Sequence, residues 1–302
     1  YKEADFWMLR QAELDFLRSL DQAWSKLAVT QRRKSVIQDR LAVLKKENGM
    51  IEKLIGAGEV EFSARQVASQ RMNDAIREFQ NVTEAELEQQ MELVKLMGMH
   101  PSSAPRLRFL TGQGFSLPAA VAAPSPAALM ESPKVKAQMA TYATTETLLK
   151  TEIRRQYPEL ELGPSFTRDD EEKEVGGEIG FNIPLWNRNR KAIAEARGVR
   201  NTARLETVQL WRTELFNARQ LEATQQMVIR HCRTELQRME SFSSSVQTME
   251  KLQGIGEASL LELAENRHQL YESRLAFLDS LDKLLGIQAQ LRYITHANLQ
   301  SK

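Results

Sequence analysis

The sequence of 302 residues contains a single cysteine, Cys232, which excludes an intrachain disulfide and a zinc site built from cysteines. No stretch of eighteen apolar residues occurs, so no transmembrane helix is expected. Bulk composition leaves a membrane β-strand open, because the signal of such a strand is alternation. The 41 basic and 40 acidic residues give a formal net charge of +1. This balance offers no electrostatic reason to expect nucleic acid as a partner.

Proline is missing from most of the chain. All nine prolines lie between Pro101 and Pro184, so that residues 1–100 and 185–302 contain none. Proline costs about 3 kcal/mol inside a helix, and two long stretches without it favour very long helices. The sequence therefore predicts a mainly α fold built from long antiparallel helices.

The spacing of apolar residues supports this interpretation. In the second proline-free stretch they recur at alternating steps of three and four, which is typical of a coiled-coil seam. The seam comprises Leu205, Val208, Trp211, Leu215, Ala218, Leu221, Val228, Cys232, Leu236, Met239, Phe242, Val246 and Met249. A helix from about residue 190 to residue 252 is predicted.

Two short segments repeat each other at an offset of 198 residues. Six of eight positions are identical between residues 52–59 and residues 250–257. Both segments contain a pair of glycines that predicts a hairpin turn, and these are Gly56, Gly58, Gly254 and Gly256. We interpret the chain as two copies of one larger unit, each with a helical hairpin.

A β-hairpin is predicted between the two copies. Residues 159–166 and 175–186 alternate between apolar and polar positions and are separated by a charged loop, residues 168–174. The apolar side of the second strand carries Val175, Ile179, Phe181, Ile183 and Leu185. A lone two-stranded hairpin is marginal in water, so this side needs a partner sheet or lipid. The alternative is a small sheet packed on helices in a soluble protein.

The predicted organisation has five parts. They are a first helical hairpin (1–100, tip near 56–58), a connector rich in proline and alanine (101–133), a helix (134–157), the β-hairpin (158–186) and a second helical hairpin (187–302, tip near 254–256). Ser132 and Pro133 are the expected cap and first position of the middle helix. The chain begins at Tyr1 with residues typical of a helix interior. At the offset of 198 residues, the counterpart of the β-hairpin would lie before Tyr1. We therefore expect the chain to be trimmed at its N-terminus.

The order of these parts resembles the TolC-type outer membrane efflux proteins over essentially the whole chain. The strand-to-helix junction Pro184-Leu185-Trp186-Asn187-Arg188-Asn189-Arg190 is most similar to the heavy-metal cation efflux branch. The segment that begins at Gly254 and continues to Glu265 is similar to the periplasmic hairpin tip of the family.

This resemblance implies a homotrimer in the outer membrane that extends into the periplasm. Each subunit would give strands to a shared β-barrel in the lipid, with the apolar side of the hairpin facing lipid. The long helices would continue the barrel as an α-helical tunnel. The glycine tips would dock a periplasmic adaptor that links the tunnel to an inner-membrane pump. The implied function is passive conduction in a tripartite efflux system.

Two carboxylates near the second tip are candidates for a channel constriction. Glu262 and Glu265 lie three residues apart and hence on one helix face. The resemblance implies that three subunits bring such carboxylates together in an acidic ring, which favours cations and can raise carboxylate pKa values. The alternative for the two carboxylates is that they lie on an ordinary solvated helix face. The alternative for the four glycines is that they form plain turns with no partner. The aromatic and basic gating residues of the family are replaced here by Gln253 and Ala258.

No catalytic or cofactor-binding pattern is present in the sequence. The four histidines are scattered and share no metal-ligand spacing, and no phosphate-binding loop or nucleophile elbow occurs. We therefore expect no enzymatic activity, no cofactor and no metal site. The remaining rival to a channel is a soluble coiled-coil scaffold, which explains the long helices but not the alternating strands.

Overall fold

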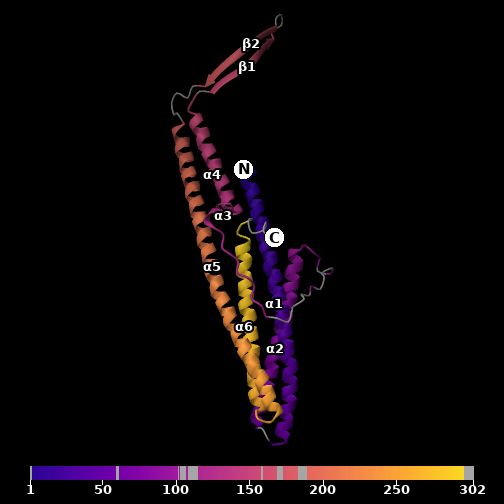
Figure 1. Ribbon diagram of the computed structural model, residues 1–302. Coiled ribbons are helices and arrows are strands. Elements are labelled where there is room, and N and C mark those ends of the chain that lie inside the picture. The colour runs from indigo at the N-terminus through magenta and orange to yellow at the C-terminus, as the bar shows by residue number, and fades with distance from the viewer. Residues whose placement is uncertain are drawn as a thin grey trace. The chain divides into compact units, whose positions relative to one another are not determined.

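The computed structural model describes residues 2–58, 61–100, 102, 107, 115–157, 159–168, 173–182 and 189–295. The helices are α1 (Lys2–Gly56), α2 (Phe62–Leu96), α3 (Pro126–Met130), α4 (Pro133–Arg154), α5 (Arg190–Gly254) and α6 (Leu260–Arg292), and the strands are β1 (Glu159–Arg168) and β2 (Lys173–Asn182) (Figure 1). The fold is mainly helical, as predicted.

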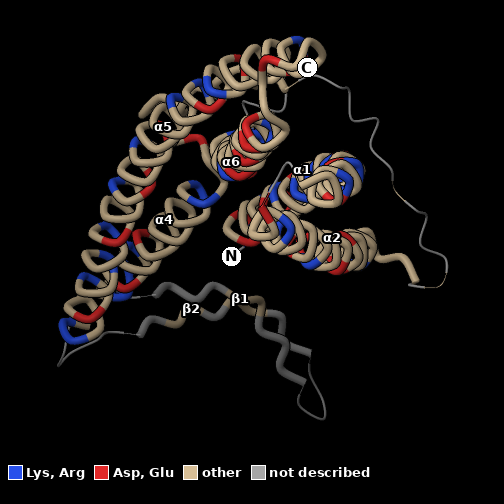
Figure 2. The backbone as a smooth tube through the Cα atoms, turned by 90° about the horizontal axis from the view of Figure 1, so that it is seen from below, with Lys and Arg blue, Asp and Glu red and all other residues tan. Residues whose placement is uncertain are grey.

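The chain divides into two compact units. The strand unit comprises residues 1–13, 124–217 and 295–297, and the tip unit comprises residues 14–123, 218–294 and 298–302. Helices α1 and α5 contribute to both units, since they contain 55 and 65 residues. Helices of this length agree with the absence of proline from both stretches. Basic and acidic residues are interspersed along the helices in Figure 2, in agreement with the balanced net charge.

Both hairpin turns have the same backbone geometry. Gly58 has a φ of +74° and Gly256 a φ of +78°, the left-handed region that glycine adopts at no steric cost. The N–H of Gly58 donates to the carbonyl of Ile55, and the N–H of Gly256 donates to the carbonyl of Gln253, each at 3.0 Å. The two hydrogen bonds are related by the same offset of 198 residues as the sequence repeat, which supports the duplication.

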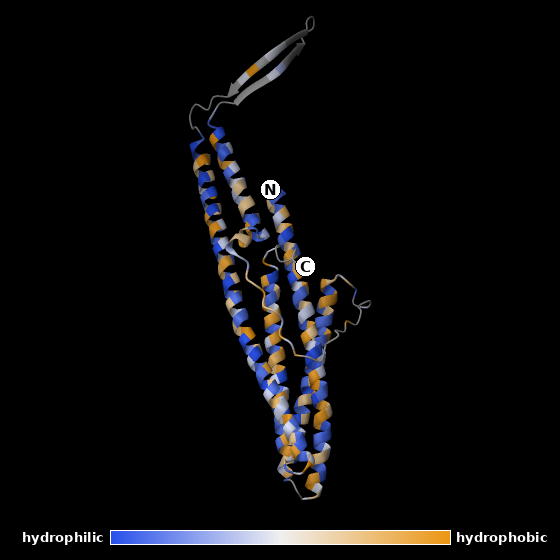
Figure 3. Ribbon diagram, in the orientation of Figure 1, coloured by the Kyte–Doolittle hydropathy of each residue, from blue (hydrophilic) through white to orange (hydrophobic). Residues whose placement is uncertain are grey.

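The core of the tip unit joins all four of its long helices. Buried residues of α1, α2, α5 and α6 form one cluster, which includes Val36, Ile37, Val82, Val228, Cys232, Met239, Val246, Tyr271, Phe277 and Leu284. The lower part of the predicted α5 seam, from Val228 to Met249, lies in or against this cluster, as predicted. Figure 3 shows hydrophobic residues recurring along these helices.

The upper part of the predicted seam differs from expectation. Leu205 is 69% exposed and Val208 is 41% exposed, although their spacing is that of core residues. Both side chains lie on one face of α5, which is covered further along the helix, where Trp211 contacts the carbonyl of Pro126, and is open at Leu205 and Val208. The spacing identifies an apolar stripe and does not specify what packs on it.

The connector is held against the helices of the tip unit by two buried glutamines. The side chain of Gln225 accepts from the N–H of Val121 at 2.9 Å and donates to the carbonyl of Val121 at 2.8 Å. Gln288 donates to the carbonyl of Ala119 at 2.8 Å. Backbone groups of the connector are thereby hydrogen-bonded without a neighbouring strand.

The connector also contains a helix that was not predicted. Helix α3 starts at Pro126, and the side chain of Ser125 accepts from the N–H of Ala128. Helix α4 begins in the same way at Pro133, with Ser132 as its cap, which confirms the prediction there. A serine followed by proline is the same start signal at both places.

The two strands pair in the register that the alternation requires. Leu160 pairs with Phe181 and Leu162 with Ile179, so the predicted apolar positions of β1 and β2 are register partners. Val175 pairs with Phe166. Ile179 is 63% exposed. The last two residues of the predicted lipid-facing set, Ile183 and Leu185, lie outside the described residues.

Asn189 directly precedes α5 and connects that helix to α4. Its φ of +49° lies in the left-handed region, which asparagine tolerates better than most residues. The Asn189 side chain donates to the carbonyl of Glu152 at 3.0 Å and to the Glu152 carboxylate at 2.7 Å. These bonds tie the start of α5 to the end of α4.

No described helix has the length and apolar character needed to cross a lipid bilayer.

Candidate functional site

The two hairpin tips meet in the tip unit. Ile51 of α1, Ala68 of α2 and Leu260 of α6 form a small buried cluster there, and both turns lie at the same end of this unit in Figure 1. A cavity of about 840 Å³ adjoins the cluster and is lined mainly by alanine, serine and leucine side chains. Gln253 and Ala258 line this cavity.

Glu262 has a structural role in the chain. Its carboxylate accepts from the backbone N–H of Ser259 at 3.1 Å, and its own N–H donates to the Ser259 hydroxyl at 3.1 Å. This capping box begins α6. If Glu262 also lined a constriction, the same carboxylate would serve both the constriction and the helix cap.

Glu265 already has a cationic partner within the chain. Its carboxylate accepts from Arg71 on α2 at 2.6 Å and from Gln269, one turn later on α6, at 2.9 Å. The hydrogen bond from Gln269 and then that from Arg71 lower the pKa of Glu265 below its ordinary value. This direction is opposite to the rise expected from crowded carboxylates. In the single chain, Glu265 therefore stays ionised at neutral pH.

The four tip glycines are sterically open. No heavy atom lies within 4 Å of a Cβ built on Gly56, Gly58, Gly254 or Gly256. Close packing within the chain therefore does not require glycine at these positions. At Gly58 and Gly256 the positive φ does require it.

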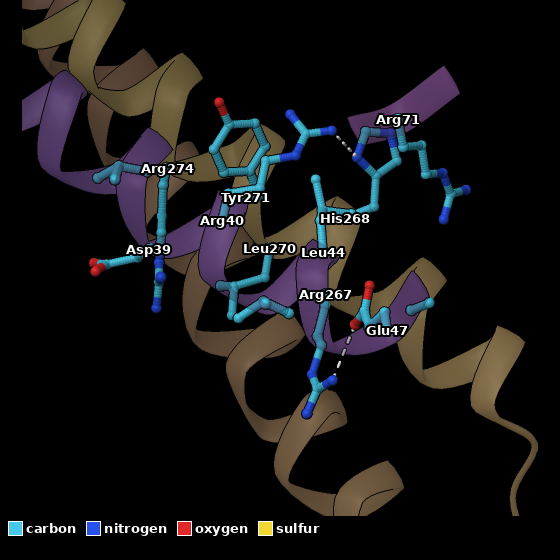
Figure 4. A pocket seen from close by; sticks show the side chains of 13 residues that line it. Asp39, Arg40, Leu44, Glu47, Arg71, Arg267, His268, Leu270, Tyr271 and Arg274 are labelled. Atoms are coloured by element: carbon cyan, nitrogen blue, oxygen red, sulfur yellow. Dashed lines mark hydrogen bonds and ion pairs between the residues drawn. The ribbon is translucent and has the colours of Figure 1, made fainter. Parts of the chain in front are cut away.

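A cluster centred on Arg40 joins three helices above the tips (Figure 4). The Arg40 guanidinium lies 3.8 Å from the ring centroid of Tyr271, and its Nη2 is 3.3 Å from Nδ1 of His268. Its Nη1 is 3.6 Å from the carboxylates of Glu78 and Glu272. The Tyr271 hydroxyl donates to Glu78 at 2.7 Å. The cluster thus connects α1 with α2 and α6.

Burial shifts the pKa values of two members of this cluster, Tyr271 and His268. It raises the pKa of Tyr271, and the hydrogen bond to Glu78 adds to the rise. Burial also lowers the pKa of His268, and the positive charge of Arg40 acts in the same direction. Tyr271 is therefore a neutral hydrogen-bond donor at physiological pH.

A second ion-pair group joins the two hairpins through Arg267. Its guanidinium donates to Glu47 of α1 at 2.9 Å and to Glu250 of α5 at 2.8 Å. The Arg71–Glu265 pair described above connects α2 with α6. Sequence reasoning missed these pairs. The partners in Arg267–Glu47 and Arg71–Glu265 lie 220 and 194 positions apart, and those in Arg267–Glu250 lie 17 apart on two different helices, so none leaves a local pattern.

Metal-ligating side chains are scattered in the described part of the chain. Within those residues, no three or more histidine, cysteine, aspartate or glutamate side chains are grouped as a metal site would require. Cys232 is buried and unpaired, and burial raises the pKa of its thiol, which makes it less reactive.

No protein-family model matches the sequence, and no curated protein matches it. Solved structures share its fold. The CmeC outer membrane channel of Campylobacter jejuni is 13% identical with a TM-score of 0.76, over 97% of this chain and 64% of that one. The outer membrane protein VceC of Vibrio cholerae is 14% identical with a TM-score of 0.78, over 96% and 71%. CusC, solved in studies of transmembrane channel formation, is 14% identical with a TM-score of 0.77, over 98% and 70%.

These likenesses confirm the fold that the resemblance to TolC-type proteins predicted. The chain spans about two thirds of the length of these channels, between 64% and 71% for the three named. Their TM-scores differ by only 0.02, so the fold does not single out the heavy-metal branch.

Proposed function

We propose that this chain is a subunit of an outer-membrane efflux channel, a passive conduit for substrates driven by an inner-membrane pump. The observation that carries the proposal is the likeness of nearly the whole chain to outer membrane channels, with TM-scores of 0.76 to 0.78 over 96% to 98% of its residues. The subunit would act as a homotrimer that spans the outer membrane and extends into the periplasm.

The β-hairpin supports a place in lipid. Its register brings the apolar positions of β1 and β2 together as partners, and Ile179 is largely exposed in the single chain. A closed barrel shared with other subunits would satisfy the free strand edges and place Val175, Ile179, Phe181, Ile183 and Leu185 against lipid.

The ion pairs between the hairpins suggest how the conduit is held shut. We propose that the channel opens when the hairpin tips splay on contact with a periplasmic adaptor. In this chain, splaying would separate α6 from α1 and α2. It would therefore break the Arg71–Glu265 and Arg267–Glu47 pairs. The Arg71–Glu265 pair is partly exposed, and such pairs contribute only about 0 to 1 kcal/mol. The Glu47 carboxylate of the other pair is buried, so that pair costs more to break, and docking of an adaptor would have to supply this energy.

The acidic constriction stays a proposal. Three copies of Glu262 and Glu265 would favour cations at a narrow mouth. Because Arg71 neutralises Glu265 in the single chain, the proposed negative field would strengthen when the tips separate. The open glycine turns, at Gly58 and Gly256 above all, would be the adaptor contacts.

Conductance in planar lipid bilayers tests the channel. The full-length protein should form discrete, cation-selective pores, and Arg71→Gln should raise the open probability by removing a pair between the hairpins. Arg230→Gln, at an exposed α5 residue without an ion pair among the described residues, is the matched control. Absence of pores, together with recovery of the protein in the soluble rather than the envelope fraction, would favour a coiled-coil scaffold instead.

Heavy-metal cations are the first cargo to test. The similarity of residues 184–190 to the metal-efflux branch supports this choice. A strain without the protein should become sensitive to transition-metal salts and recover on complementation. Unchanged metal tolerance with increased sensitivity to organic drugs would contradict the metal assignment and leave the channel role intact.

A further inference from the structure

The side chain of His268 connects α6 to α1. Its Nδ1 is 3.3 Å from Nη2 of Arg40, a contact drawn as a dashed line in Figure 4. A guanidinium carries only donors, so Arg40 donates in this bond and Nδ1 of His268 accepts. The imidazole is therefore neutral with its proton on Nε2, because a protonated Nδ1 has no lone pair to offer.

Glu272 is the carboxylate next to this contact. It is 3.6 Å from Nη1 of Arg40 and 3.7 Å from Nδ1 of His268. While His268 is neutral, the charge of Glu272 acts on Arg40 and so also joins α6 to α1. Glu272 and His268 are four residues apart on α6, a spacing at which opposite charges pair along one helix face. A protonated His268 would therefore compete with Arg40 for Glu272, and a contact between helices would become one within α6.

Charged groups face His268 from each neighbouring helix. Arg40 comes from α1, Arg71 from α2, and Glu272 and Glu265 from α6 itself. Burial and then the charges of Arg40 and Arg71 lower the pKa of His268 below its ordinary value of 6.5, while Glu272 and Glu265 oppose this. Other charged residues surround this group, and these are Asp39 and Glu47 of α1, Glu78 of α2, Glu250 of α5, and Arg267 and Arg274 of α6.

We propose that His268 is an acid-sensitive contact between the two helical hairpins, in which the neutral imidazole holds α6 to α1 through Arg40 and protonation breaks that hold. Protonation removes the acceptor and places two cations 3.3 Å apart. The Arg40 side chain is only 10% exposed, so water screens this repulsion poorly. Of its contacts with α6, Arg40 would then keep the ring of Tyr271.

The direction of the pH response follows from the burial of His268. Because its pKa is lower in the folded chain than in the unfolded one, its contribution to stability is present above the ordinary value of 6.5 and is lost as the pH falls through the folded value. Acid should therefore loosen α6 from α1. In a channel this would ease the splaying of the tips, a consequence that rests on the proposed function, whereas the contact itself lies within one chain.

Amide hydrogen exchange of the full-length protein at pH 7.5 and pH 5.0 tests the contact. His268→Asn keeps an acceptor oxygen in place of Nδ1 and cannot be protonated. On acidification, the wild-type protein should lose about threefold or more protection in α6 around residue 268 relative to His268→Asn, because a hydrogen bond is lost. His231→Asn, at an exposed position of α5, is the matched control and should respond as the wild type does. Glu265 does not interfere, since its lowered pKa keeps it ionised at pH 5.0.

Nitrogen NMR of protein labelled at histidine is a second test that needs no change at His268. The chain has four histidines, so its signal can be assigned by replacing the other three in turn. At pH 7.5 we expect the proton on Nε2, and Arg40→Gln should move the protonation of His268 to higher pH by removing a positive charge.

The proposal fails if His268 carries its proton on Nδ1, or if Arg40→Gln leaves its titration unchanged. It also fails if the wild-type protein and His268→Asn lose protection alike on acidification, or if His231→Asn has the same effect as His268→Asn. Neither measurement depends on pore formation, so a failure of the proposed function would be recognised separately by the conductance experiment.

Discussion

Replacement of Gln225 by methionine should release the connector from α5. Gln225 is 1% exposed and forms two hydrogen bonds, of 2.9 Å and 2.8 Å, with the N–H and carbonyl of Val121. Methionine keeps the length and apolar contacts of the side chain but pairs with neither backbone group. A buried polar group left unpaired costs about 1 to 3 kcal/mol.

Because Val121 is itself only half-buried, water can reach part of its backbone. The cost summed over its N–H and its carbonyl should therefore lie in the lower half of the range for two such groups. We expect the free energy of unfolding to fall by about 2 to 4 kcal/mol. The connector should also become more accessible to proteases, because its hydrogen bonds hold it on the helix.

Urea-induced unfolding and limited proteolysis of the full-length protein measure both effects. Gln226→Met is the matched control, since Gln226 is the exposed neighbour on the same helix and should change stability by less than about 0.5 kcal/mol. If Gln225→Met and Gln226→Met unfold alike and are cleaved alike, the two hydrogen bonds do not anchor the connector.

Three further predictions concern the tip and the strand-to-helix junction. Gly256→Ala should lower stability by about 1 to 2 kcal/mol through its left-handed backbone alone, since an added Cβ meets no atom within 4 Å; an unchanged thermal midpoint would contradict this. Asn189→Gly keeps that backbone region accessible and removes both hydrogen bonds to the end of α4, so chemical denaturation should show a loss of about 1 to 3 kcal/mol. The hydrogen bond from Gln269 and then that from Arg71 lower the folded pKa of Glu265, so its contribution is present above the ordinary value of 4.5 and is lost as the pH falls through the folded value. Arg71→Gln should therefore flatten the acid side of the curve of thermal midpoint against pH, and an unaltered curve would show that the pair has no such role.

The sequence predicted those features that depend on local or periodic signals. Helices α1 and α5 follow from the absence of proline, and the two strands follow from alternation of apolar and polar residues along each of them. The serine–proline start of α4 was recognised at Ser132, and the identical signal at Ser125 was not applied.

The features that were missed depend on which helix faces which. Arg71 and Glu265 are 194 positions apart, and Gln225 bonds backbone 104 positions away. No local periodicity encodes such partners. For the same reason the exposure of Leu205 was not foreseen, because spacing identifies an apolar face and leaves its neighbour unspecified. Glu262 was predicted as a constriction residue, and its place in a helix cap follows from Ser259 three positions earlier.

The matching turns at the ends of the two helical hairpins determine how many copies of a ligand one chain can bind at its tips. A ligand that contacts only backbone groups would have two nearly equivalent binding sites, one at Gly58 and one at Gly256. A ligand that reads side chains would distinguish them, because the residue before the second glycine is Ala57 in one turn and the exposed Ile255 in the other. The stoichiometry of any complex at these turns therefore reports which kind of recognition operates.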